Sequence, residues 1–550
     1  MKKLSLLQCG ILFALLLLNG FKASAVFAAC PYQPSTNLHA LRDHPALLIS
    51  HMVTVEGVIS AILMAPGQLG GLFIQSLNEP VRGIFVYAPN IPEQRQLKVG
   101  TQILIRARLH EFKGQLELSN IDQIWICGQH ALSPKTVNLT KLDALQLRAL
   151  EGVLIHITNK MIVIDNHQLA QYGSLTLAPL RPIKGIIEQP TDKYLILDDG
   201  SHHANPRPVP YLNYLETRRV GSSLNDLTGI LTFAFDHFRL HPTQQPQFSD
   251  DNPRPPALSM PRAGSLRIAS FNIENYFLTQ GERGAKNLAV MQEQRAKLIP
   301  AILALNADLL ALMEVENEPT ALQDLVNRIN RFQPTHEQYL AVAGQRHWGA
   351  DAIRVAILFK PSQLRLVKLL ADDRQANFIR PPMIASFTTH RGYPLTVVAA
   401  HFKSKAGCPR KGDVDDSQGC WNQKRLSQSR ALRALLHHLK LDNNQLLIMG
   451  DLNSYEGEAP LKSLMAHDLH NTIAERVPAS QRYTYIYHGL AGALDHILAG
   501  KVIDALIERA GIWHINADEP AFLAYDRDWT QNRSIYRSSD HDPVWADLQN

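Results

Sequence analysis

Residues 446–454 read LLIMGDLNS, an apolar run that ends in Asp451 and Asn453. A short continuous apolar run is typical of a strand that is buried on both faces of an α/β sheet. Because side chains alternate between the two faces of a strand, Asp451 and Asn453 are expected to point to the same side. Ligand-binding residues of α/β folds gather at the ends of such strands. The stretch therefore predicts a layered α/β domain with polar chemistry at one sheet edge.

The same pattern recurs on both sides of this stretch. Apolar runs meet polar residues in SFNIEN (270–275), LLALMEVEN (309–317), VVAAHFKSK (397–405), GALDHILAG (492–500) and SSDHDPVWADL (538–548). Segments with helical spacing lie between them, at 287–305, 320–332 and 423–440. This alternation predicts one α/β domain over residues 266–550. The runs present these polar residues: Asn272, Glu314, His401, Lys403, Asp451, Asn453, Asp495, Asp540 and His541.

These residue types suit the hydrolysis of a phosphodiester. Its negative charge repels hydroxide, so catalysis needs a divalent cation on the phosphoryl oxygens. The oxygen ligands of Asn272, Glu314 and Asp540 favour Mg²⁺, Mn²⁺ or Ca²⁺ over zinc. His541 can take a proton from water near neutral pH, and Asp495 could hold that imidazole in one tautomer. The set predicts a metal site beside a general base.

The remaining candidates would handle the phosphate. Asp451 and Asn453 could position the water and the phosphate together. His401 could donate a hydrogen bond to the phosphate, and Lys403 could neutralise its charge. Each motif is weak alone, since a lone GDxN occurs in turns and an isolated histidine is more often structural. The ordered set carries the prediction.

The N-terminal half is predicted to be β structure. Runs at 53–63, 70–76, 82–88, 101–112 and 113–121 are separated by glycines and prolines, as in small barrels. ALEGVLIHI (149–157) and VGSSLNDLTGILTFAFDHFRLHP (220–242) echo two of these runs. We expect β modules at 30–130 and 131–241 and a proline-rich linker at 242–265. The first module has few basic residues near its aromatics, so a packing role is expected for Phe73, Phe85, Tyr87 and Phe112.

The N-terminus has the features of a secretory signal peptide over residues 1–29. Lys2 and Lys3 precede an apolar run at 4–18, and small residues at 23–29 fit cleavage. A membrane anchor and an acylated Cys30 are competing interpretations, but the run is short for a span. We expect no stable membrane insertion. Export would remove three lysines and take the net charge from +5 to about +2, so attraction to phosphate must come from local patches.

Four cysteines remain after export. An even number in an exported chain suggests two disulfides, with three possible connectivities. The economical pairing joins Cys30 to Cys127 and Cys408 to Cys420. Zinc binding is the alternative, although the chain has no close CxxC pair. The second disulfide would close an acidic loop that either binds a structural Ca²⁺ or is simply solvated, with Asp413, Asp415 and Asp416.

The ordered motifs SFNIEN, ADLLALMEVEN, AAHFKSK, GDLNS, LDHIL and SSDHDPV resemble those of the endonuclease/exonuclease/phosphatase superfamily, the fold of deoxyribonuclease I. The resemblance covers about residues 266–548 and implies a four-layered α/β sandwich. More narrowly, the β modules, the loop HFKSKAGCP…GCWNQKR and AGALDHILAG resemble bacterial extracellular nucleases of the ExeM type. The modules resemble OB-like domains, which bind single strands through basic grooves and stacked aromatics.

The resemblance implies roles for particular residues. Asn272 and Glu314 would lie at the metal, with help from Asp540, and Asp495 would support His541. His401 would contact the scissile phosphate, while Asp451 and Asn453 would orient the nucleophile and the phosphate. Arg380 resembles an arginine that touches the DNA backbone, and Asp351 is expected to be the acidic partner of His401.

The chain is therefore predicted to be a secreted or periplasmic monomeric nuclease. It would use Mg²⁺ or Mn²⁺ to hydrolyse extracellular DNA, with RNA as a further substrate. The sequence ends soon after SSDHDPV, which favours a free form over a surface-tethered one. Two alternatives stay open: a secreted phosphoesterase of the same fold that acts on lipid or inositol phosphates, and a nucleic-acid-binding protein without activity.

Overall fold

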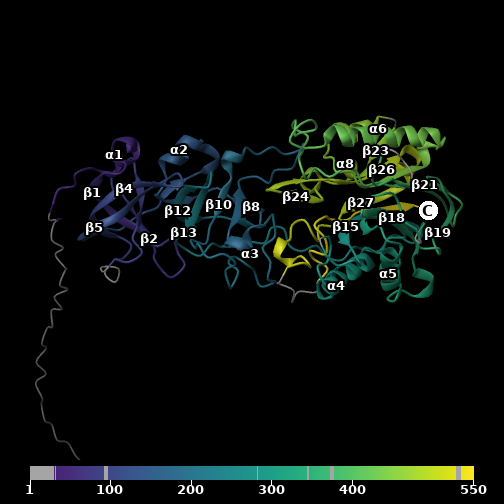
Figure 1. Ribbon diagram of the computed structural model, residues 1–550, viewed down its shortest axis with the longest axis horizontal. Helices are drawn as coiled ribbons and strands as arrows, with labels where there is room; N and C mark the ends of the chain where they lie inside the picture. The colour runs from purple at the N-terminus through teal and green to yellow at the C-terminus, as the bar shows by residue number, and fades with distance from the viewer. Residues whose placement is uncertain are drawn as a thin grey trace, which may run out of the picture.

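The computed structural model of the chain describes residue 30 and residues 32–91, 97–281, 283–343, 346–371, 377–466, 468–527 and 534–549. The expected signal peptide, residues 1–29, lies outside the described residues. The described chain forms three parts in a row: a β barrel, a second β module and an α/β domain (Figure 1). No helix within these described ranges has the length and hydropathy that a membrane crossing requires.

The first part is a closed barrel of five strands in the order β1-β2-β3-β5-β4. Its β4 strand buries Ile105 and Ala107 and exposes Arg106 and Arg108, the period-two pattern of a strand with one face on a core. The expected disulfide between Cys30 and Cys127 is present and ties the preceding segment to β5. The elements are α1 (Leu38–Asp43), β1 (Met52–Leu63), β2 (Gly71–Gln75), β3 (Gly83–Tyr87), β4 (Thr101–Phe112) and β5 (Gln115–Gln129).

The second part is a nine-stranded sheet in the order β14-β11-β8-β9-β10-β13-β12-β7-β6. Part of it repeats the pairing of the barrel: β10 is parallel to β13 as β3 is to β5, and β12 is antiparallel to β13 and β7 as β4 is to β5 and β1. The β12–β13 hairpin thus takes the place of β4–β5, in agreement with the sequence echo. The elements are β6 (Lys135–Val137), α2 (Ala144–Ala149), β7 (Leu154–Ile157), β8 (Met161–Asp165), α3 (Leu169–Tyr172), β9 (Leu175–Ala178), β10 (Leu195–Leu197), β11 (Ser223–Leu224), β12 (Leu227–Ala234), β13 (His237–Pro242) and β14 (Phe248–Ser249).

The segment expected to be a linker is anchored at several points, although most of its side chains are exposed. Its Phe248–Ser249 strand, β14, pairs with β11. The carbonyl of Pro256 accepts a 3.0 Å hydrogen bond from Trp513 Nε1, and Arg254 forms an ion pair with Glu519 at 2.8 Å. The segment therefore follows an extended path over the α/β domain and is not a flexible linker.

The α/β domain contains two six-stranded sheets, in the orders β17-β18-β16-β15-β28-β27 and β19-β20-β21-β22-β26-β23. The first comprises β15 (Ser265–Tyr276), β16 (Leu309–Glu316), β17 (Leu340–Ala341), β18 (Ile353–Phe359), β27 (Ile507–Ile512) and β28 (Val544–Gln549). The second comprises β19 (Leu364–Leu369), β20 (Met383–Thr389), β21 (Pro394–Ala399), β22 (Leu446–Asp451), β23 (Leu469–Asn471) and β26 (Asp495–Gly500). A separate hairpin joins β24 (Tyr485–Tyr487) to β25 (Leu490–Gly492).

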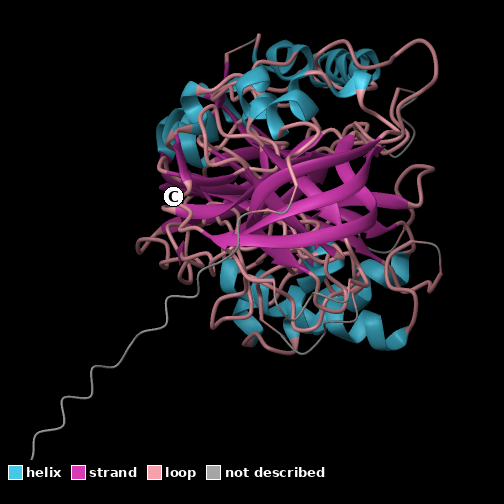
Figure 2. Ribbon diagram, turned by 90° about the vertical axis from the view of Figure 1, so that its left-hand side faces the viewer, coloured by secondary structure: helices cyan, strands magenta, loops and turns pink. Residues whose placement is uncertain are grey.

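Helices cover the outer faces of both sheets, so strands lie between two helical layers (Figure 2). One buried core joins the two sheets through residues such as Met313 and Met449. A second core packs Leu298 and Leu325 of α4 and α5 on the first sheet, and a third packs Leu432 of α6 on the second. This is the expected four-layered order. The helices are α4 (Leu288–Leu305), α5 (Pro319–Asn330), α6 (Asn422–His438), α7 (Ala459–Met465), α8 (Thr472–Arg476) and α9 (Lys501–Leu506).

Candidate active site

One amide joins the two sheets at the centre of the site. Asn272 is buried on β15, and its Nδ2 donates to Glu314 Oε1 at 3.3 Å and to Asp451 Oδ2 at 3.1 Å. Glu314 belongs to β16 of the first sheet, whereas Asp451 ends β22 of the second. Three residues predicted from separate motifs therefore meet where the strands of both sheets end.

Glu314 lies at an irregularity of the first sheet. The β16–β18 register shifts between Leu312 and Val315, and Glu314 has a φ of 66°, which is rare outside glycine. Such backbone strain costs on the order of 1–3 kcal/mol and concentrates at functional sites. Burial and the negative charge of Asp540 raise the pKa of Glu314 to about 7. Negative charge thus accumulates here, as expected where a cation binds.

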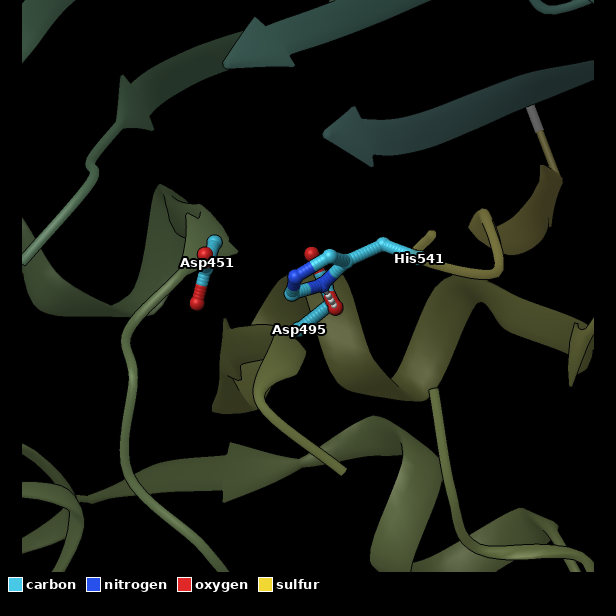
Figure 3. A group of neighbouring side chains, drawn as sticks. All are labelled: Asp451, Asp495 and His541. Atoms are coloured by element: carbon cyan, nitrogen blue, oxygen red, sulfur yellow. Dashed lines mark hydrogen bonds and ion pairs between the residues drawn. The ribbon is translucent and has the colours of Figure 1, made fainter. Parts of the chain in front are cut away.

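His541 and Asp495 form a buried acid–imidazole pair. His541 Nδ1 lies 2.7 Å from Asp495 Oδ2, and Thr484 Oγ1 donates to the same oxygen at 2.6 Å. Figure 3 shows the ring of His541 against the carboxylate of Asp495, with its tip directed toward Asp451. Burial alone would lower the pKa of His541, but the charges of Asp495 and Asp540 hold it well above its usual value. The Nδ1 contact leaves Nε2 as the atom that can exchange a proton with substrate or water.

His401 and Asp451 form a second buried pair. His401 Nε2 lies 3.3 Å from Asp451 Oδ2, while the backbone N–H of Asn453 donates to Asp451 Oδ1 at 2.9 Å. Burial and the charge of Arg380 lower the pKa of His401 to about 4, so the imidazole is neutral at neutral pH. Asp451 keeps its negative charge despite burial, because His401 and the Asn453 N–H lower its pKa.

The structure corrects one expected contact. Asp351 is not the partner of His401, because its carboxylate faces Arg380 Nε at 3.8 Å and Arg283 Nη1 at 3.6 Å. Arg380 also donates to the carbonyl of Phe402 at 2.6 Å, which fixes its guanidinium beside the segment after β21 that carries His401. The opposite charge of the arginines attracts Asp351 more strongly than a neutral imidazole can.

Asn453 lies beside the His401–Asp451 pair, whereas the ammonium of Lys403 faces its own loop. Asn453 Nδ2 donates to the Phe402 carbonyl at 3.3 Å, so this amide and Arg380 share one acceptor. The Nζ of Lys403 donates to the Ser404 carbonyl at 3.2 Å and is 5.0 Å from the ring centre of Trp421. Burial lowers the pKa of Lys403.

Two residues near the site were missed in the sequence. Glu274 follows Asn272 by two positions in SFNIEN, so its place on the same strand was the available signal. Burial and the charge of Asp540 raise the pKa of Glu274 well above its usual value. Tyr485, with its ring centre 4.8 Å from that of His541, comes from the β24–β25 hairpin and carries no motif in the sequence.

The donors at this site fit a metal ion. Ligand atoms of Asp451, Asp495 and His541 all lie within 4.8 Å of one another. Asn272 links Asp451 to Glu314, whose pKa is raised by burial and by the negative charge of Asp540. Carboxylate and amide oxygens are the ligands of hard cations such as Mg²⁺ and Mn²⁺. The cluster therefore has the chemistry of a divalent-metal site.

The acidic loop beside the site is organised by its own backbone. Cys408 and Cys420 form the expected disulfide. Asp413 accepts hydrogen bonds from the backbone of Gln423 and Lys424 at the start of α6, and Asp415 accepts from backbone N–H groups of its own loop. These carboxylates shape the loop and the N-terminus of α6.

A buried acid–imidazole site of this kind, at the strand ends of an α/β sandwich, is suited to phosphoester hydrolysis. The model of the Endonuclease/Exonuclease/phosphatase family matches residues 269–541, so the C-terminal half is a domain of this family of phosphoester hydrolases. A search of curated proteins finds no match.

Solved structures give further similarities. An endonuclease/exonuclease/phosphatase family protein from Bacteroides thetaiotaomicron is 13% identical, with 53% of this chain and 98% of that chain covered and a TM-score of 0.35. The mannosyl-6-phosphatase of the same organism is 15% identical, with 52% and 99% covered and a TM-score of 0.36. D. rerio TDP2 in complex with a single-strand DNA product is 17% identical, with 52% and 99% covered and a TM-score of 0.33. None of these similarities bears on the substrate of this chain.

Proposed function

We propose that this chain is an exported, metal-dependent nuclease of the extracellular type, which hydrolyses phosphodiester bonds in DNA and also in RNA. The observation that carries the proposal is the convergence of the His541–Asp495 pair and the Asn272–Glu314–Asp451 cluster in one buried site. The two disulfides suit an oxidising compartment outside the cytoplasm. We also propose the domain division at residues 30–130, 131–241 and 266–550, and we propose that both β modules are OB-like.

Each residue has a task in the proposed reaction. His541 Nε2 takes the proton of the attacking water, and Asp495 orients the imidazole and stabilises its cation. Asp451 and Asn453 orient the water and the phosphate. These roles place proton transfer and positioning in one pocket.

The phosphate is held by the cationic and polar side chains. His401, Lys403 and Arg380 are proposed to contact the phosphate oxygens, with Arg380 fixed by Asp351. Asn272, Glu314 and Asp540 would hold Mg²⁺ or Mn²⁺, with Asp451 beside them. When bound, such an ion neutralises charge on the phosphoryl oxygens and leaving group.

The mature chain should be incubated with circular plasmid DNA, linear DNA, RNA and sphingomyelin. EDTA should abolish cleavage of nucleic acid, and added Mg²⁺ or Mn²⁺ should restore it, because the carboxylates repel the phosphate without a cation. Hydrolysis of sphingomyelin alone would replace the proposal with a lipid phosphoesterase. Binding of DNA without cleavage under any metal would identify the chain as a nucleic-acid-binding protein. Full activity in EDTA would show that the reaction needs no metal.

A further inference from the structure

A single large groove runs along the three parts of the molecule. It has a volume of about 1440 Å³ and is lined by residues of the barrel, the second module and the α/β domain. Small-molecule pockets have roughly 300–1,000 Å³. Asp540 and Glu274 line one end of this groove, so it is continuous with the candidate active site. Its size and its course suit a polymer that enters the site from the side of the β modules.

Equivalent hairpins of the two β modules meet in this groove. Phe112 and Lys113 lie at the β4–β5 turn, and Phe235 lies at the β12–β13 turn. Lys113 Nζ is 5.2 Å from the ring centre of Phe112 and 5.3 Å from that of Phe235. The guanidinium of Arg239 is 5.3 Å from the Phe235 ring. Two aromatic rings and two cations therefore share one place in the groove.

The groove aromatics are unusually exposed for such large side chains. Tyr87, Phe112, Tyr172, Phe235 and Tyr487 line it with relative exposures from 45% to 62%. Phe73 and Phe85, by contrast, are buried against Leu154 and Ile230 between the modules. The expected packing role thus holds for two of the four barrel aromatics. These rings keep exposed surface on which flat partners can stack.

The strand order of the barrel indicates the same groove as a binding surface. A barrel of five strands of the OB type binds oligonucleotides on the face of its second and third strands and on the loops between strands 1–2 and 4–5. Here the groove is lined by Tyr87 at the end of β3, by Leu69 of the β1–β2 loop and by Phe112 and Lys113 of the β4–β5 hairpin.

We propose that this groove binds a single strand of nucleic acid and leads it into the active site. This inference rests on the proposed nuclease function and adds the form of its substrate. Bases stack on exposed rings only when they are unpaired, so the aromatics favour a single strand over a duplex.

The charges in the groove set the expected salt dependence. Lys113 and Arg537 are cations along it, whereas Arg239 is held by Asp198 at 2.6 Å and Arg527 pairs with Asp526 at 3.5 Å. The acidic residues of the lining outnumber its lysines and arginines: Glu117, Asp165, Asp198, Glu274, Glu519, Asp526 and Asp540. Binding therefore depends more on stacking than on phosphate contacts, and the logarithmic salt slope should be shallow, about −1.4 for two contacts.

Binding can be tested with fluorescein-labelled oligothymidylates, from a dinucleotide to about 16 nucleotides, the upper site size of one OB fold. The full mature chain is kept in EDTA so that no strand is cut, and anisotropy gives Kd. We expect Phe112→Ala and Phe235→Ala each to raise Kd for the longest strand at least about fivefold. The matched control is Tyr214→Ala, since Tyr214 is 87% exposed on the second module and lies off the groove.

The activity of the active site is measured separately as the hydrolysis of bis(4-nitrophenyl) phosphate with Mg²⁺. This small diester does not occupy the groove. Both groove variants should hydrolyse it at the wild-type rate. Unchanged Kd in both variants, equal binding of duplex and single strands, or preference for an unrelated peptide would overturn the groove proposal. If no diester is hydrolysed although the groove variants weaken strand binding, the nuclease function fails and the groove proposal stands.

Discussion

His541 and Asp495 illustrate how two distant residues become one chemical unit. They are far apart in the sequence, yet Nδ1 and the carboxylate are 2.7 Å apart and both side chains are buried. A buried carboxylate next to an imidazole stabilises its cation and fixes its tautomer. At the scale of single residues, the proposed chemistry therefore depends on this pair.

Replacing His541 by alanine should remove the general base. General acid–base catalysis contributes roughly 10²–10⁴-fold, so kcat for DNA should fall by about that factor. Plasmid cleavage measures the rate, and near-ultraviolet circular dichroism checks the fold. His470→Ala is the matched control, because His470 contacts Glu475 away from the site. A folded His541→Ala protein with wild-type kcat would refute the assignment.

Asp495→Asn should change the pH dependence of the reaction. The charge of Asp495 helps to raise the pKa of His541, so its loss should lower that pKa. The base acts in its neutral form, and activity rises as the pH increases through its pKa. The acidic limb of kcat against pH should therefore move to lower pH, with a lower plateau because the imidazolium loses its partner.

The control for this substitution is Asp226→Asn, at a side chain that is 80% exposed. Its pH profile should match that of the unchanged protein. An acidic limb that stays in place in Asp495→Asn would mean that another group titrates there.

At the scale of elements, the loop after β27 ties the second module to the active site. Its Asp518 is fully buried and pairs with Arg219 at 3.0 Å and with Arg181. Burial would raise the pKa of Asp518, but the two guanidinium groups lower it to about 2. Asn516 of the same loop donates to the carbonyl of His541 at 2.6 Å. The module thus helps to hold the loop that positions the base.

Arg219→Ala should destabilise the protein strongly. Removing one partner of a buried ion pair costs at most roughly 3–5 kcal/mol, and here Arg181 still compensates part of the charge of Asp518. Differential scanning calorimetry should show a clearly lower Tm. The control is Arg262→Ala, whose side chain is 72% exposed beside Glu508 and whose ion pair contributes about 0–1 kcal/mol. Equal Tm values for both variants would contradict a structural role of Arg219.

At the scale of the whole molecule, the α/β domain and the second module share a buried core and buried ion pairs. Phe522 and Leu523 of the α/β domain pack in the core of the second module, and Arg181 and Arg219 cross to Asp518. The barrel is attached through a smaller cluster that includes Leu154 and Ile230. Deletion of the barrel alone and deletion of both β modules should therefore affect folding differently.

Deletion of residues 30–130 should leave a folded protein. It exposes about two apolar side chains of the second module, at roughly 1.5–3 kcal/mol each. Deletion of residues 30–250 should prevent stable folding, because Asp518 loses both arginines. Soluble yield and calorimetry compare the two chains. If the chain without residues 30–250 unfolded at the Tm of the full protein, the α/β domain would be independent of the second module.

The sequence by itself determined the α/β class, the layered order and the residues that gather at the strand ends. It also predicted two disulfides and β structure in the N-terminal half, whereas the structure selected the pairing among three connectivities. Apolar runs and the polar residues that follow them are local features of the sequence. They therefore indicate where a strand lies and which polar residues stand near its end.

Only the tertiary structure decided which of these residues touch. It pairs His401 with Asp451 and not with Asp351, anchors the expected linker, brings Glu274 and Tyr485 to the site and joins two hairpins in one groove. Such contacts depend on how whole surfaces pack and on how charges are compensated. Neither produces a periodic pattern of residues in the sequence.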